Sequence, residues 1–537
     1  MAYHWMGVGE AIGAAAIMRT DESPSTTVEL QQLAALERRR LGLETDVVDG
    51  TVLAAAVRHF AKRGIVLPTF SELEKPASIS PSLRTAVAAI SADVPHPLNL
   101  FRIHWFNDVD RTGTVRVPGY LVMPHALTGV KATIAVMLGE RFPMIAAHKV
   151  LAAYACLVPR LVTGQFDVTE QRAVWPSTGN YCRGGVAIAR VMGCHAVAVL
   201  PAQMSAERFA WLRDWVPAAE DIVRTPGSES NVREIYDECE ALALDPRNLI
   251  LNQFSDYGNA LSHHRVTGTA LMRVFDDLKR TSPVRALHSF VSATGSAGTL
   301  SAGDRVREEL GSRNVVVEAT ECPTLLKNGF GEHNIQGIGD RHVPLIHNVF
   351  STDDLVGVSD LATDSLFYLC GDEIGRDYLT HRQGIAADTL PALSRLGLSA
   401  WANILAAIQI ARAYDLDDTQ AILTVATDSG ELYKSERKRI LERRFHGRFD
   451  ELTAAEIFGQ FVKGAPAGAH VELRRSERER IFNLGYFTWV EQRHVSLEVF
   501  MLRSRMEFWK RLRTLPDRWD EHIRDFNDRV RVGPGAR

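Results

Sequence analysis

Two turns rich in glycine and hydroxyl residues hold the residues of this sequence that could do chemistry. The first reads WPSTGNYCRGG over residues 175–185 and leads into a helical pattern. The second reads TGSAGT over residues 294–299, between an apolar segment and another helical pattern. A glycine-rich turn at a helix N-terminus presents backbone N–H groups that bind phosphate or carboxylate. Both turns therefore predict anion-binding loops, although such a turn can also simply join a strand to a helix.

The second turn does not have the spacing of a nucleotide-binding motif. It matches neither G-x-G-x-x-G nor G-x-x-x-x-G-K-[ST], because position 297 is alanine and no lysine follows. Glycine and alanine still allow the backbone to approach an anion closely, and Ser296 and Thr299 add hydroxyl groups. The turn thus predicts an anion-binding site, but its spacing does not identify the anion.

The segments around these turns alternate between short apolar runs and amphipathic stretches. Ligands of parallel α/β sheets bind beyond the carboxyl ends of the strands, which is where both turns would lie. The alternation predicts an α/β fold with mostly parallel sheets. The expected strands are 132–138, 195–201, 249–254, 286–294, 314–320 and 421–427, and the expected helices include 28–41, 52–63, 185–192, 206–215, 302–310 and 400–414.

The composition argues against nucleic-acid-binding, membrane-spanning and disulfide-rich proteins. The chain has 537 residues, of which 46% are hydrophobic and 23% charged, with a formal net charge of -4. This balance predicts no nucleic-acid partner, and no apolar run approaches the roughly 20 residues of a membrane span. The first 25 residues lack a basic segment, so we expect no signal peptide. Six isolated cysteines predict neither a disulfide framework nor a zinc site and favour the cytoplasm.

The order of the motifs along residues 100–440 resembles the fold type II family of pyridoxal-phosphate enzymes. The similarity is greatest to the branch of cysteine synthase and cystathionine β-synthase. It implies a two-domain fold like that of the tryptophan synthase β-subunit, with mostly parallel sheets and helical N- and C-terminal extensions. The implied division is 1–95 for the N-terminal extension, 96–440 for the catalytic core and 441–537 for the C-terminal extension. The matching segments are 140–149, 176–180, 200–213, 295–299, 331–344, 396–400 and 428–430.

The resemblance implies where pyridoxal 5'-phosphate would bind. In the family a lysine after the first strand forms a Schiff base with the cofactor, and Lys149 stands at that position. The family pattern Ser-Val-Lys-Asp-Arg reads AHKVL here, so Lys149 could also be a surface lysine at a helix start. Asn180 would contact the 3' oxygen of the cofactor, and Ser399 would face the ring nitrogen unless it only caps a helix. The phosphate cup would consist of Gly295, Ser296, Ala297, Gly298 and Thr299.

The first turn corresponds to the family loop that holds the substrate carboxylate. This role is implied for Ser177, Thr178 and Gly179, which could alternatively form a helix N-cap. Tyr181 and Arg183 replace smaller residues of the family and would lie near the substrate. Arg183 could pair with a second acidic group or could brace the loop.

The implied reaction is at Cβ of an amino acid. A serine opposite the ring nitrogen, in place of a carboxylate, favours loss of a β-substituent through an aminoacrylate, giving a keto acid and ammonia. The alternatives are β-replacement, as in cysteine synthesis, and a non-catalytic binding relative. We further expect a cytoplasmic homodimer with a small amino-acid substrate, no membrane association and no metal. The histidines at 263, 264, 342 and 347 lack metal-site spacing.

Overall fold

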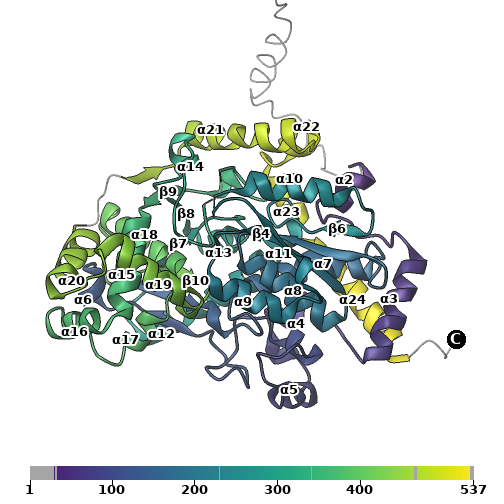
Figure 1. The fold of residues 1–537 in the computed structure, drawn as a ribbon, viewed down its shortest axis with the longest axis horizontal. Coiled ribbons are helices and arrows are strands. Elements are labelled where there is room, and N and C mark those ends of the chain that lie inside the picture. The colour runs from purple at the N-terminus through teal and green to yellow at the C-terminus, as the bar shows by residue number, and fades with distance from the viewer. Residues whose placement is uncertain (1–29, 31–32, 229, 340, 465–468, 533–537) are drawn as a thin grey trace, which may run out of the picture.

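The computed structural model describes residue 30 and residues 33–228, 230–339, 341–464 and 469–532 (Figure 1). The first 25 residues, from which we expect no signal peptide, lie outside this part of the chain. So does the beginning of the helical pattern 28–41, of which the structure shows α2 (Ala35–Arg40). The pattern 52–63 corresponds to α3 (Gly50–Arg63). Asp49 caps the start of α3 and Gly64, with φ of 63°, ends it.

A seven-stranded sheet forms the core of the larger lobe. Its order is β1-β2-β10-β7-β8-β9-β11, and only the edge pairs β1/β2 and β9/β11 are antiparallel. The central strands are almost wholly buried because helices cover both faces. The strands are β1 (Tyr120–Val122), β2 (Thr133–Leu138), β7 (Ala286–Ala293), β8 (Arg313–Ala319), β9 (Asp354–Val358), β10 (Gln420–Ala426) and β11 (His470–Glu472).

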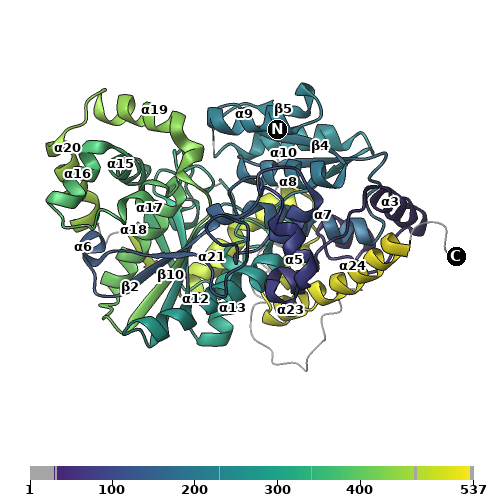
Figure 2. The same ribbon diagram turned by 90° about the horizontal axis from the view of Figure 1, so that it is seen from below.

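A four-stranded parallel sheet forms the core of the smaller lobe, beside the larger one (Figure 2). Its order is β5-β4-β3-β6. The strands are β3 (Arg172–Pro176), β4 (His195–Pro201), β5 (Ile222–Thr225) and β6 (Asn248–Ile250).

Helices surround both sheets. Those of the core are α6 (His125–Thr128), α7 (Lys149–Val162), α8 (Asn180–Met192), α9 (Ala206–Trp215), α10 (Val232–Ala243), α11 (Tyr257–Ser262), the π-helical η6 (His263–Thr267), α12 (Gly268–Thr281), α13 (Leu300–Leu310), α14 (Thr324–Lys327), α15 (Asp360–Gly371), α16 (Glu373–His381), α17 (Leu390–Ser394) and α18 (Leu398–Ala413). Those nearer the termini are α4 (Phe70–Glu74), α5 (Pro81–Ala88), α19 (Lys434–Phe445), α20 (Glu451–Ile457), η9 (Phe458–Lys463), α21 (Arg475–Tyr486), η11 (Phe487–Gln492), α22 (Leu497–Leu502), α23 (Met506–Leu512) and α24 (Leu515–Val532).

The two terminal extensions pack against each other and against the core. In both views α24 lies beside α3 at one edge of the molecule (Figures 1 and 2). Asn527 of α24 exchanges two hydrogen bonds with the backbone of Leu67, and Asp520 accepts from the backbone of Phe70 and Ser71. At the other end of the C-terminal extension, β11 joins the edge of the large sheet. Both extensions are therefore structural parts of the molecule.

The α/β fold is confirmed, and five of the six expected strands match closely. The expected strand 249–254 is wrong in length, because only residues 248–250 pair with β3 and the chain then turns toward α11. Strands β1, β3, β5, β9 and β11 were not predicted. Across the described ranges, every helix is too short or too polar to span a bilayer.

Candidate active site

The N-termini of four helices converge on one pocket between the lobes. Lys149 is the first residue of α7, Asn180 the first of α8, and Ser399 the second of α18, while Thr299 directly precedes α13. Helix N-termini carry partial positive charge and unsatisfied N–H groups, so this arrangement favours anions. The lining residues are His148, Lys149, Ser177, Thr178, Asn180, Tyr181, Gln253, Phe254, Ala293, Gly295, Ser296, Ala297, Gly298, Thr299, Gly337, Ile338, Ser399 and Thr427.

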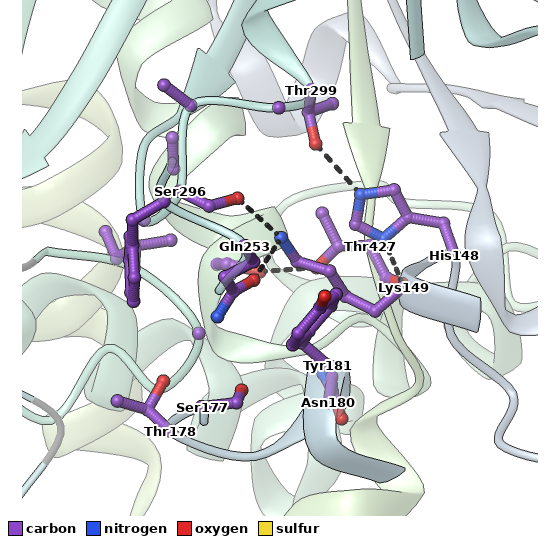
Figure 3. A pocket seen from close by; sticks show the side chains of 18 residues that line it. His148, Lys149, Ser177, Thr178, Asn180, Tyr181, Gln253, Ser296, Thr299 and Thr427 are labelled. Carbon is purple, nitrogen blue, oxygen red and sulfur yellow. Dashed lines mark hydrogen bonds between the residues drawn. The ribbon is translucent and has the colours of Figure 1, made fainter. Parts of the chain in front are cut away.

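The amine of Lys149 lies in the middle of this pocket. It donates hydrogen bonds to the Gln253 side-chain oxygen at 3.1 Å and to the Ser296 hydroxyl at 2.9 Å. Thr299 lies at one end of the pocket, and Ser177 and Thr178 lie at the other (Figure 3). Lys149 is therefore a pocket residue, not a surface lysine.

The turn Gly295–Thr299 connects β7 to α13 and forms one end of the pocket. Ala297 has φ of 65°, in the left-handed region where glycine is the usual residue. The hydroxyl of Ser296 accepts from Lys149 and, at 3.0 Å, from the amide of Asn259. Its own proton therefore remains available to an anion in the cup.

The opposite end is the loop between β3 and α8. The Ser177 hydroxyl accepts from the backbone N–H of Gly179 at 3.0 Å, which tightens the turn. Gly179 has φ of 154°, and a Cβ there would lie 2.8 Å from Arg208, so glycine is required. The amide of Asn180 is fixed from both sides, since it donates to Asp428 at 2.6 Å and accepts from Arg183 at 3.2 Å.

The two large residues after this loop lie differently. Tyr181 lines the pocket, and its hydroxyl donates to the Leu251 carbonyl at 3.1 Å. Arg183 does not line the pocket. It is 2% exposed, its guanidinium lies over the Trp211 ring, and burial lowers its pKa to about 10. Contact between Arg183 and an acidic substrate group stays a prediction, whereas the contact that braces Asn180 is observed.

Ser399 faces the pocket and does not cap α18. Its hydroxyl lies 3.0 Å from that of Thr427, and Gly397 occupies the N-cap position. Among the described residues that line the pocket, none is Asp or Glu. The side chain at the start of α18 is thus an uncharged hydroxyl in a pocket without carboxylates.

Seven residues that line the pocket were not among the predicted site residues: His148, Gln253, Phe254, Ala293, Gly337, Ile338 and Thr427. Three of them had a signal in the sequence, since His148 directly precedes Lys149, and Gln253 and Thr427 lie at the ends of the expected strands 249–254 and 421–427. Among the described residues, no group of three or more His, Cys, Asp or Glu side chains is placed to hold a metal ion. Cys182 is buried, and burial raises its pKa to about 12, so it is not a reactive thiol.

Comparison with known proteins adds the family. Residues 139–365 match the model described as "Pyridoxal-phosphate dependent enzyme". Cysteine synthase B of Campylobacter jejuni is 27% identical over 256 residues, which are 47% of this chain and 75% of that protein. A probable cysteine synthase of Bacillus subtilis is 26% identical over 262 residues, 48% of this chain and 75% of that one. The crystal structure of O-acetyl serine sulfhydrylase isoform 3 from Entamoeba histolytica covers 64% of this chain and 93% of its own, at 20% identity and a TM-score of 0.50. Residues 139–365 therefore form a pyridoxal-phosphate-dependent enzyme domain of fold type II. The curated relatives that it resembles are cysteine synthases.

The pocket of this fold type II enzyme fits pyridoxal 5'-phosphate. An amine that can form a Schiff base, Lys149, lies between a phosphate-sized turn and a hydroxyl-rich loop. The turn lies at the start of α13, where N–H groups and the Ser296 proton can bind a phosphate. Ser399 at the start of α18 lines the pocket and would supply an uncharged hydroxyl for the ring nitrogen. The residues present therefore account for the amine, the phosphate site and the ring partner that this cofactor needs.

Proposed function

We propose that this enzyme acts at Cβ of a small amino acid and eliminates a β-substituent, after which hydrolysis by water gives a keto acid and ammonia. The observation that carries the proposal is the uncharged Ser399 in a pocket whose described lining contains no carboxylate. When bound, pyridoxal phosphate supplies the electron sink for negative charge at Cα. A serine does not keep the ring nitrogen protonated as a carboxylate would, so the charge is best relieved by loss of a group from Cβ.

The chain's own residues have separate parts in this proposal. Ser177 and Thr178 bind the substrate carboxylate at the start of α8, where the helix dipole favours a negative charge. Ser177 accepts from Gly179 and so keeps its own proton for that carboxylate. The amine of Lys149, when it is not bonded to the cofactor, would remove the Cα proton as a general base. Ser296 and Gln253 hold its amine in the middle of the pocket.

The second candidate is β-replacement, in which a nucleophile adds where the leaving group departed. The relatives named as cysteine synthases support this alternative. Both reactions use the same residues up to loss of the β-substituent. They differ only in what enters the pocket next.

The test has a spectroscopic and a product arm. We expect the purified chain to show a Schiff-base absorption band near the violet edge of the visible spectrum, and Lys149→Ala to lose or shift it. Lys131→Ala is the matched control, because Lys131 is exposed and does not line the pocket. No band after addition of cofactor would refute the proposal.

Amino acids carrying a β-leaving group are then incubated with and without sulfide or a thiol. Keto acid and ammonia without the nucleophile support elimination, and a new amino acid only with it supports replacement.

We also propose a cytoplasmic homodimer with residues 96–440 as its catalytic core and with 1–95 and 441–537 as bracing extensions. Six buried free cysteines are consistent with a reducing compartment. Phe330 is 81% exposed and Phe487 61%, and a second copy could cover such side chains. Light scattering after size-exclusion chromatography tests the dimer directly, since a mass near the 59.5 kDa of one chain would exclude it.

A further inference from the structure

His148 links the catalytic lysine to the phosphate end of the pocket. It directly precedes Lys149 and is 1% exposed. Its Nε2 lies 2.9 Å from the Thr299 hydroxyl, and its Nδ1 lies 3.2 Å from the backbone carbonyl of Thr427 (Figure 3). The ring therefore spans the distance between the phosphate turn and the end of β10.

These two contacts determine which ring nitrogen carries the proton. A carbonyl oxygen only accepts, so Nδ1 must be the N–H that donates to Thr427. A neutral imidazole has one N–H, and Nε2 is then an acceptor. The Thr299 hydroxyl consequently donates to Nε2. Because a hydroxyl has a single proton, Thr299 has none left for a phosphate.

The surroundings of His148 keep the ring neutral. Burial lowers its pKa to about 3, and the charge of Lys149 acts in the same direction. The other titratable ring that faces it is His263 on η6, with ring centroids 4.9 Å apart, and burial keeps that pKa low too. On the third side lies the indole of Trp105, which carries no charge. A second proton on His148 would thus meet an apolar or cationic neighbour on each of these sides.

The position of the Thr299 side chain agrees with a hydroxyl that is bonded to His148 and not to its own helix. It occupies the N-cap position of α13 but makes no side-chain cap hydrogen bond, although threonine commonly does so. Ser296, in contrast, accepts from Lys149 and Asn259 and keeps its proton. The two hydroxyls of the turn are therefore not equivalent toward an anion.

We propose that His148 is a positioning residue whose Nε2 accepts the hydrogen bond of the Thr299 hydroxyl, so that the phosphate is bound by the backbone N–H groups of the turn and by Ser296, not by Thr299. Thr299 then affects cofactor binding only indirectly: its hydrogen bond to His148, which in turn bonds to Thr427, holds the turn against the end of β10. The inference rests on the cofactor assignment and not on which reaction occurs at Cβ.

The experiment is a double-mutant cycle on the dissociation constant of pyridoxal 5'-phosphate, measured by absorbance titration of the full chain freed of cofactor. The variants are His148→Val, Thr299→Val and both together, with His148→Gln as the conservative control. We expect each single valine variant to weaken binding about fivefold, as for loss of about one hydrogen bond. The double variant should bind no more weakly than the weaker single variant, because the two side chains act as one unit. His148→Gln should stay within about twofold, since its amide can replace both contacts.

Two results would overturn the inference. In the His148→Val background, the inference requires that Thr299→Val causes no further loss of affinity. A loss there as large as in the wild type would show that the Thr299 hydroxyl binds the phosphate directly. A pH dependence of affinity between about pH 6 and 8.5 that His148→Gln abolishes would show that the imidazole becomes charged. His148→Ala repeats the cycle if His148→Val unfolds, with thermal unfolding of each chain as the check. Failure of the wild type to bind the cofactor would remove this inference and the proposed function together, whereas normal affinities without activity at Cβ would remove only the latter.

Discussion

The side-chain amide of Asn180 donates a hydrogen bond to Asp428 at 2.6 Å, which joins α8 of the smaller lobe to the loop after β10 of the larger one. Tyr433 donates to the same carboxylate oxygen at 2.6 Å, and Arg208 of α9 lies 4.0 Å from it. Asp428 is 2% exposed and Arg208 0%. One buried carboxylate therefore connects the two lobes beside the pocket.

Replacement of this carboxylate should destabilise the protein. In Asp428→Asn the buried charge of Arg208 loses its carboxylate partner, and we expect the free energy of unfolding to fall by about 3 kcal/mol. Denaturant titration measures the change. Asp418→Asn serves as control because Asp418 is exposed, and a change of more than about 0.5 kcal/mol would be unexpected there. Equal stability of the two variants would mean that the connection between the lobes does not depend on the charge.

Ala297 is held in a conformation that disfavours a side chain. Its φ of 65° costs alanine about 1–2 kcal/mol relative to glycine, part of which the greater freedom of glycine in the unfolded chain offsets. We expect Ala297→Gly to raise the unfolding free energy by about 0.5 kcal/mol. Ala302→Gly, in the buried interior of α13, should lower it by about 1 kcal/mol. Thermal unfolding of the two variants should shift in opposite directions, and a shared direction would contradict the argument.

His342 should make the protein acid-sensitive. The ring packs between Phe254 and Trp489, and burial lowers its pKa to about 3. In the unfolded chain its pKa is about 6.5, so below that pH the unfolded state binds a proton that the folded state does not. Its contribution to stability is therefore present above about pH 6.5 and is lost as the pH falls, by up to about 1.4 kcal/mol per pH unit.

The variant His342→Phe keeps a ring in this space and removes the titration. Denaturant titrations at about pH 7 and pH 5.5 should show a smaller loss of stability for the variant than for the wild type. His381→Gln, at an exposed position, should leave the difference unchanged. If His342→Phe and the wild type lose the same free energy, the ring is not kept neutral by the fold.

Asn527 should be essential to the contact between the terminal extensions. Its amide donates to the Leu67 carbonyl at 2.8 Å and accepts from the Leu67 N–H at 2.9 Å. Asn527→Ala leaves both buried backbone groups without this partner, which should cost about 2 kcal/mol of unfolding free energy. The neighbouring exposed Asp528→Ala is the control. A proteolysis assay offers a second reading, since α24 should be cleaved faster in Asn527→Ala alone.

The sequence by itself determined the type of fold and most of its elements. Apolar runs such as 132–138 and 421–427 predict buried parallel strands because burial on both faces requires apolar residues throughout. Strands β3, β5 and β9 escaped prediction because they are only four or five residues long and contain arginine, proline or glycine. The two turns rich in glycine and hydroxyl residues could also be predicted from the sequence, because the backbone conformation of a turn depends on neighbouring residues.

Only the tertiary structure decided which side chains meet. Lys149 and Gln253 lie 104 positions apart in the chain, and His148 and Thr299 lie 151 apart. Such contacts depend on the order β2-β10-β7 in the large sheet and on how the smaller lobe docks against it. Periodicity is a property of neighbouring residues and carries no information about that order. The same reason explains Arg183: its charge and position in the loop were visible, but its burial against Trp211 was not.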